Sequence, residues 1–137
     1  MNLRKKYHKL FQKTKYLVYC NNKIYNIQIN KNNKWIDKCL TGKKGWTLIT
    51  AFNPLPKILS QEENIKRNKD LETLIKKAGL IYYNAKGIGN NDWVEDSFLI
   101  LNISKRKAIE LGNKYSQLAI IYGIKSNPAK ILFLVPG

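Results

Sequence analysis

Residues 46–79, WTLITAFNPLPKILSQEENIKRNKDLETLIKKAG, decide the fold, because they join a strand to a helix. WTLITAF (46–52) is a mostly apolar run that stops at an Asn-Pro pair, which is typical of a buried strand. Ser60 and Glu63 have the spacing of a capping box and predict a helix start, while Gly79 predicts its end. The apolar positions at helical spacing between them are Leu71, Leu74, Ile75 and Ala78.

The chain after this helix continues the alternation of strand and helix. We predict strands over LIYYNA (80–85) and WVEDSFLILNI (93–103), separated by a polar, glycine-rich link. Ser104 predicts the cap of a second helix, and LAIIYG (118–123) and AKILFLV (129–135) are expected as closing strands. The order β-α-β-β-α-β indicates an α+β fold: a ferredoxin-like antiparallel sheet with two helices on one face, plus an extra C-terminal strand.

Two further β-rich runs, KYLVYC (15–20) and KIYNIQI (23–29), precede this unit. The Asn21-Asn22 pair between them tolerates the left-handed conformation of a tight turn, so we predict an N-terminal β-hairpin. A short helical turn is expected over residues 36–40. The closing strands are nearly all apolar, which predicts that both faces of the sheet are covered. The hairpin or a second subunit would supply the second cover.

The positive charge is concentrated near the N-terminus. The chain has 25 Lys and Arg against nine Asp and Glu, and residues 1–45 hold twelve of the basic residues and one acid. We predict a basic N-terminal arm over residues 1–14 and a single α+β domain over residues 15–137. Such an arm is typical of contact with nucleic acid or another polyanion, although AT-rich codons would also enrich Lys and Asn.

Several classes of protein are excluded by residues that the sequence lacks. No stretch is apolar and long enough to span a bilayer, and no export signal is visible, so we expect a cytoplasmic protein with Cys20 and Cys39 reduced. The single histidine, His8, argues against a Ser-His-Asp, Cys-His or zinc site. The glycines around Ile88 lie between two strands and favour a turn over a phosphate-binding loop. We expect no cofactor.

The strand over residues 93–103 carries the most informative polar side chain, Glu95. Alternation places Trp93, Glu95 and Ser97 on one face, which continues into apolar positions. A carboxylate at the mouth of an apolar stripe is either functional or paired with a lysine, and both readings stay open here. The acidic neighbours Asp92 and Asp96 do not suggest a metal site, since Glu95 and Asp96 point to opposite faces.

Four motifs follow one another in a fixed order along the chain. They are Thr50-Ala51-Phe52-Asn53-Pro54, the spaced pair Asn64 and Asn68, Trp93-Val94-Glu95-Asp96-Ser97, and Gln117 at the entry to the next strand. In this order they resemble a widespread family of small bacterial domains of unknown function, and the resemblance covers almost the whole chain. It implies no activity by itself.

The same skeleton is more distantly similar to the S-adenosylmethionine (SAM) lyases of phages, long called SAM hydrolases. The shared features are the strand end Thr50-Ala51-Phe52, a helix with Asn and Arg that ends in Gly, the Glu-x-Ser strand and the strand Ala119-Ile120-Ile121-Tyr122. The similarity implies a phage-encoded homotrimer in a bacterial cytoplasm, with the active site between subunits near Glu95. The chain departs from the lyases at Asn53-Pro54, at Trp93 and at Gln117, which replaces a second acidic group.

The reaction of these lyases suits a chain without a suitable His, Cys or metal site. The carboxylate of SAM attacks its own γ-carbon and releases methylthioadenosine and homoserine lactone, so the protein only positions the substrate in a dry site. The similarity implies that Glu95 positions the substrate and that Phe52, Tyr82 and Tyr83 flank adenine or the sulfonium, unless they are core aromatics. The other expected substrate contacts are Asn53, Asn64, Trp93, Ser97 and Gln117.

Two alternatives from other classes stay open. The chain could be a nucleic-acid or ribosome-associated binding domain that uses the basic arm. It could also be a non-catalytic member of the uncharacterised family.

Overall fold

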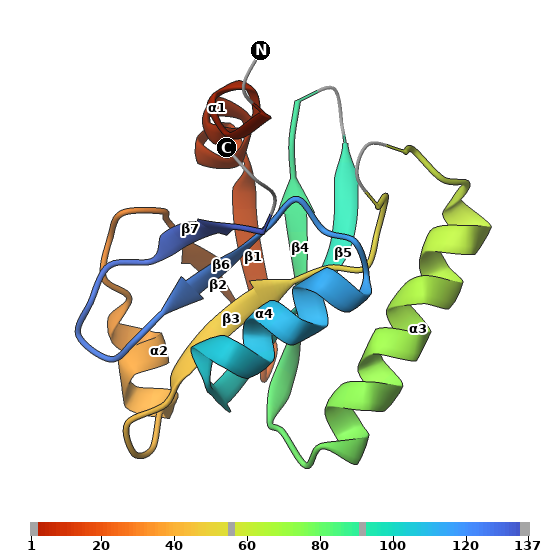
Figure 1. Ribbon diagram of the computed structural model, residues 1–137. Helices are drawn as coiled ribbons and strands as arrows, with labels where there is room; N and C mark the ends of the chain where they lie inside the picture. The colour runs from red at the N-terminus through yellow and green to blue at the C-terminus, as the bar shows by residue number, and fades with distance from the viewer. Residues whose placement is uncertain (1–2, 55–56, 91–92, 135–137) are drawn as a thin grey trace.

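The structure, a computed structural model, describes residues 3–54, 57–90 and 93–134 and has four helices and seven strands in these ranges (Figure 1). Four short N-terminal elements come first, and the expected series of strands and helices follows them. The elements are α1 (Leu3–Lys13), β1 (Lys15–Cys20), β2 (Lys23–Ile27), α2 (Lys34–Cys39), β3 (Gly45–Ile49), α3 (Gln61–Lys77), β4 (Tyr82–Ile88), β5 (Val94–Ile103), α4 (Lys105–Lys114), β6 (Ala119–Gly123) and β7 (Lys130–Phe133).

All seven strands belong to one antiparallel sheet in the order β2-β1-β4-β5-β3-β6-β7. Strands β3 and β4 both run antiparallel to β5, so they are parallel to each other with β5 between them. The expected α+β class and antiparallel sheet are therefore confirmed. The sheet differs from a four-stranded ferredoxin-like sheet because β1 and β2 extend it beyond β4, and β7 extends it beyond β6.

Local sequence signals set the ends of the main helices as expected. The Ser60 side chain accepts a hydrogen bond from the Glu63 N–H at 3.1 Å, and the Glu63 carboxylate accepts one from the Ser60 N–H. Gly79 follows α3 with a φ of 70°, in the left-handed region that favours glycine. In the hairpin, Asn21 and Asn22 both have positive φ, which confirms the tight turn between β1 and β2.

Strand β4 extends farther than the sequence predicts. Residues 86–88, assigned above to a polar link, continue the strand through Ile88. The reason is that β4 is paired on both sides: Ile88 lies opposite Lys15 of β1 and opposite Val94 of β5. Two ladders hold a glycine-containing segment extended although its local composition favours a turn.

Helices α3 and α4 pack against one face of the sheet, as expected (Figure 1). Leu71 and Ile75 of α3 and Ala108 and Leu111 of α4 are buried there. The sheet residues in this cluster are Ile49, Phe98, Ile100, Ile103 and Ile120.

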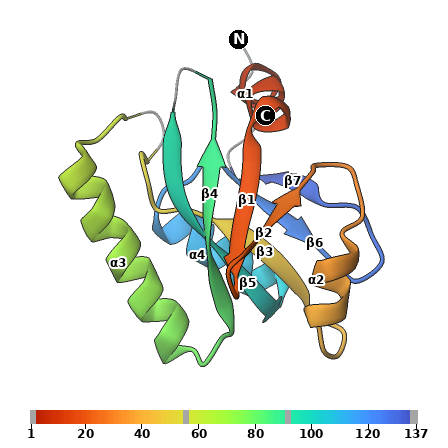
Figure 2. The ribbon, with the colours of Figure 1, turned by 180° about the vertical axis from the view of Figure 1, so that it is seen from behind.

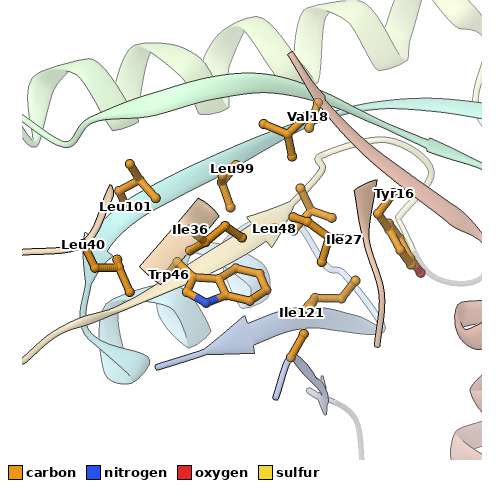
Figure 3. Packing of buried hydrophobic residues seen from close by; sticks show 12 residues of the cluster. Tyr16, Val18, Ile27, Ile36, Leu40, Trp46, Leu48, Leu99, Leu101 and Ile121 are labelled. Atoms are coloured by element: carbon orange, nitrogen blue, oxygen red, sulfur yellow. The ribbon is translucent and has the colours of Figure 1, made fainter. Parts of the chain in front are cut away.

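The other face of the sheet is covered by the N-terminal part of the same chain. The sheet curls until its outer strands approach each other, since Ile29 beyond β2 forms a parallel bridge with Ala129 before β7. The Asn30 N–H donates to the Ala129 carbonyl at 2.7 Å. Helix α2 packs on this face through the fully buried Ile36, and side chains from β1, β2, β3, β5 and β6 meet around Trp46 (Figure 3).

Helix α1, in the segment expected as a basic arm, packs on the domain beside β7 (Figure 2). The Phe11 ring meets the Phe133 ring edge-on with centroids 6.2 Å apart. The Tyr16 hydroxyl donates to the Phe11 carbonyl at 3.0 Å, which ties the end of α1 to β1. No helix among the described residues is long and apolar enough to cross a membrane.

Candidate functional site

A pocket of about 470 Å³ opens at the end of the curled sheet where α1 lies. Its walls come from α1, β1, the end of β3 with the loop that follows it, the β4–β5 hairpin and β6. Six of the nine expected site residues line it: Phe52, Asn53, Trp93, Glu95, Ser97 and Gln117. The volume lies within the range of roughly 300–1,000 Å³ that is usual for small-molecule sites.

Glu95 stands half-buried in the wall of this pocket. Its Oε2 atom accepts a hydrogen bond from Asn53 Nδ2 at 2.9 Å. Among the described residues, the ion pairs to acidic side chains are those of Glu110 with Arg106 and Lys107, so no lysine neutralises Glu95 there. The lysine-paired reading of Glu95 therefore finds no support among the described residues, and a functional role of Glu95 stays a prediction.

Burial raises the pKa of the Glu95 carboxyl above its usual value. Hydrogen bonds from the Asn53 and Trp93 side chains act in the opposite direction, since they favour the ionised form. The net result is a carboxylate that would gain from a cation placed beside it in the pocket.

Asn53 holds Glu95 because its own backbone and side chain are fixed. Its φ of 45° lies in the left-handed region, which asparagine tolerates better than most residues. The Asn53 N–H donates to Asn64 Oδ1 at 2.8 Å, and Asn64 Nδ2 donates back to Asn53 Oδ1 at 2.9 Å. Asn64 is buried behind Asn53 and does not line the pocket, so it is a positioning residue.

The end of β3 is held by side chains where its strand pairing stops. Asn68 Oδ1 accepts from the Ala51 N–H at 2.7 Å, and Asn68 Nδ2 donates to the Asp96 carbonyl at 2.8 Å. Arg67 Nε donates to the Ala51 carbonyl, and Gln117 Nε2 donates to the Phe52 carbonyl at 3.0 Å. Backbone groups in residues 51–53 therefore find partners on α3 and at the entry to β6, which explains the paired asparagines at i and i+4.

The adjacent acids Glu95 and Asp96 of β5 point to opposite faces of the sheet, as the alternation of a strand predicts. Glu95 faces the pocket, whereas Asp96 faces a groove on the α3 side. Ser97 returns to the pocket face and donates its hydroxyl to the Glu95 carbonyl at 3.2 Å. Trp93 lies at the rim with 43% of its surface exposed. Asp92 lies outside the described residues, and the described residues hold no metal-binding group of three or more His, Cys, Asp or Glu.

Tyr82 and Tyr83 do not line the pocket. Tyr82 lies on the α3 side of the sheet, where its hydroxyl donates to Glu72 Oε2 at 2.6 Å and its pKa is raised to about 12, chiefly by burial. The Tyr83 ring lies 5.8 Å from that of Trp35, at the edge of the core inside the curled sheet. Both residues pack as core aromatics, which is the alternative reading given above.

Tyr16 lines the pocket although the sequence did not single it out. Sheet register places Tyr16 opposite Gly87 and Gly87 opposite Glu95, so the three residues form one row across β1, β4 and β5. Because Gly87 has no side chain, space remains between the tyrosine ring and the carboxylate. Burial raises the pKa of the Tyr16 hydroxyl, and the charge of Glu95 raises it further. Only the long-range pairing of β1 with β4 reveals this row.

Helix α1 also contributes walls that the sequence did not predict. Its aromatic and aliphatic side chains close one side of the pocket, and the exposed Lys57, after β3, also belongs to the lining. The α1 residues that line the pocket are Tyr7, Leu10 and Phe11.

The antiparallel α+β sheet and the carboxylate-bearing pocket define a small α+β protein with a ligand-sized site within one chain. The chain belongs to the DUF3293 family, described as a protein of unknown function, whose model matches residues 49–120, or 72 of the 137 residues. This fits the expected membership of an uncharacterised family. The match itself assigns no activity and does not test the similarity to SAM lyases. No curated protein and no solved structure matches the chain.

Proposed function

We propose that the pocket binds S-adenosylmethionine and that the protein is a SAM lyase. The observation that carries the proposal is Glu95: a half-buried carboxylate in a pocket wall, held by Asn53 and without an ion-paired lysine among the described residues. An uncompensated carboxylate favours a cationic ligand, and the sulfonium of SAM is such a cation.

The composition of the pocket supports a ligand with a flat apolar part. Phe52, Tyr7, Phe11, Tyr16 and Trp93 line it together with several aliphatic side chains. Aromatic rings of this kind stack on a purine or contact a sulfonium through their faces. Polar side chains such as Asn53, Glu95 and Gln117 stand among these apolar walls, and contacts of this kind set the orientation of a ligand.

The proposed reaction is intramolecular. A carboxylate oxygen of SAM attacks the γ-carbon, a C–O bond forms, the C–S bond breaks and its electron pair stays on sulfur. The products are methylthioadenosine and homoserine lactone, and no proton is transferred in this step. Orientation alone can supply roughly 7–11 kcal/mol of rate enhancement in favourable cases. The anionic and cationic groups lose their charges as the bond forms, so a pocket with little water favours the transition state.

Glu95 has a positioning role in this scheme. The carboxylate would draw the cationic end of SAM toward β5, while the aromatic walls hold the adenosyl group. A contact that binds the ground state and the transition state equally well does not accelerate the reaction. The Glu95 contact should therefore orient the methionine tail of SAM without binding its cationic group tightly. General acid–base chemistry by Glu95 is not required.

The similarity to phage lyases extends the proposal to a phage-encoded homotrimer in a bacterial cytoplasm. It also suggests a ferredoxin-like unit within the wider sheet. The neighbouring strands β4-β5-β3-β6 support it, since β3 and β4 run parallel to each other with the antiparallel β5 between them. The pocket itself is formed within one chain, and its exposed rim residues Leu10, Ile58 and Trp93 offer apolar surface to a neighbouring subunit.

The test is incubation of the purified protein with SAM, followed by mass spectrometry of the products. We expect methylthioadenosine and homoserine lactone, with turnover reduced roughly 100-fold by Glu95→Gln, the scale on which substrate misplacement slows a reaction. The control is Asp96→Asn, one residue along β5 on the other face, which should keep its turnover. If the wild-type protein binds SAM without releasing methylthioadenosine, the lyase proposal is wrong and the protein is a SAM-binding protein.

A second candidate function rests on α1. The helix LRKKYHKLFQK carries five basic side chains and no acid, and its lysines are exposed. This pattern fits contact with RNA or another polyanion, including a ribosome-associated role.

A further inference from the structure

The residues that line the pocket include one acid and one base, and the base, Lys57, is exposed. Among its described lining residues, Glu95 is the only acid and Lys57 is the only lysine or arginine. The remaining polar lining groups are neutral hydroxyls and amides. A site with one carboxylate and one ammonium in largely apolar walls is complementary to a ligand that carries both signs of charge.

Asn53 bonds both to the Glu95 carboxylate and to the backbone two residues after Lys57. Asn53 Nδ2 donates to Glu95, while Asn53 Oδ1 accepts from the Leu59 N–H at 2.9 Å and so holds the loop that carries Lys57. The Lys57 N–H donates to the Pro54 carbonyl at 2.6 Å, which ties the Lys57 backbone to the residue that follows Asn53. One residue therefore links the strand that presents the carboxylate to the loop that presents the ammonium.

Lys57 is not used elsewhere in the described structure. Its side chain is exposed, and no ion pair with a described acidic residue occupies its ammonium group. A lysine of this kind is a compact point charge on a flexible stem, suited to reach a carboxylate at the mouth of a pocket.

We infer that the pocket selects a zwitterion, with Lys57 as the specificity-determining residue for its carboxylate and Glu95 for its cationic group. The inference rests on the proposed function for the choice of ligand, since SAM carries a carboxylate, an ammonium and a sulfonium. Lys57 would hold one carboxylate oxygen and leave the other directed at the γ-carbon.

The test is calorimetric binding of three related compounds to the full-length chain. They are SAM, decarboxylated SAM, which lacks the carboxylate, and S-adenosylhomocysteine, which lacks the positive charge on sulfur. We expect wild-type protein to bind SAM roughly three- to tenfold more tightly than decarboxylated SAM, the range expected for a partly solvated charge pair. Lys57→Met should remove this preference and leave the affinity for decarboxylated SAM unchanged. Lys57→Arg should retain part of the preference.

Lys66→Met, an exposed lysine of α3 outside the pocket lining, is the matched control and should bind all three compounds as the wild type does. Equal affinity of wild-type protein for SAM and decarboxylated SAM overturns the inference, as does a Lys57→Met variant that keeps the preference. If the protein prefers SAM over decarboxylated SAM but releases no methylthioadenosine, the inference is supported and the lyase reaction is rejected. Failure of all three compounds to bind overturns both.

Discussion

Glu95 combines a half-buried carboxylate with hydrogen bonds from the Asn53 and Trp93 side chains, and this arrangement has a consequence for stability. Because burial raises the folded-state pKa, the folded protein binds the proton more tightly than the unfolded chain. The ionised side chain therefore opposes folding. This unfavourable contribution is absent below the ordinary glutamate pKa of about 4.3 and grows as the pH rises through the raised folded value.

Glu95→Gln should consequently make the fold more stable than the wild type at pH 7, because the neutral amide is not penalised by burial as the carboxylate is. The amide oxygen can still accept from Asn53 Nδ2, so the hydrogen bond is kept. The gain over the wild type should shrink as the pH falls toward 4, and urea unfolding at several pH values measures it. A variant less stable than the wild type at pH 7 would show that the carboxylate is structural.

At the scale of elements, β1, β4 and β5 create the space of the pocket through the row Tyr16, Gly87 and Glu95. A Cβ placed on Gly87 would meet the Thr14 methyl at 3.6 Å and the Tyr16 ring at 3.7 Å, both ordinary contacts with residues that line the pocket. Gly87 has no positive φ, so a larger residue is compatible with its backbone.

The series Gly87→Ala and Gly87→Val should therefore fill the pocket stepwise without unfolding the sheet. Val has a high strand propensity, and the fold should tolerate it within about 1 kcal/mol. Affinity for SAM should fall in the order wild type, alanine, valine, measured by calorimetry beside thermal unfolding. If Gly87→Val binds SAM as tightly as the wild type does, SAM does not bind in this part of the pocket.

Sequence patterns predicted the elements that local signals define. The capping box of Ser60 and Glu63, the turn at Asn21-Asn22 and the opposite faces of Glu95 and Asp96 are all present in the structure. These features depend on neighbours within a few residues, so periodicity and capping rules suffice to find them.

Features that depend on long-range pairing were not predictable in the same way. The extension of β4 through Ile88 requires ladders with β1 and β5, and the placement of Tyr16 in one row with Glu95 requires the register of three strands. Tyr82 and Tyr83 are adjacent in sequence, yet alternation sends them to opposite faces and neither reaches the pocket. Strand propensity carries no information on which strands become neighbours.

For the whole molecule, α1 has two separable properties. Its apolar side chains line the pocket, whereas Lys6, Lys9 and Lys13 are exposed and do not. The combined change of these three lysines to Gln should leave SAM binding unchanged, while deletion of residues 1–14 should weaken it and increase the binding of an apolar dye. The two variants separate loss of charge from loss of packing.

The same variants test the second candidate function. If α1 contacts single-stranded RNA, each lysine that contacts a phosphate should contribute about 0.7 to the log–log slope of affinity against salt, and its loss should reduce the slope by that amount. Filter binding over a range of salt concentrations measures this slope. RNA affinity that survives in the three-glutamine variant would reject the helix as the contact surface.

The bridge between Ile29 and Ala129 joins positions 100 residues apart, and it affects how the chain can fold during synthesis. When the ribosome has made the N-terminal hairpin, the strands that complete its sheet are still absent. The apolar side chains of the hairpin and α2 must then wait for most of the remaining chain before they are enclosed. A stalled or truncated nascent chain would expose this surface and an unpaired strand edge, so we expect it to aggregate or to be retained by chaperones.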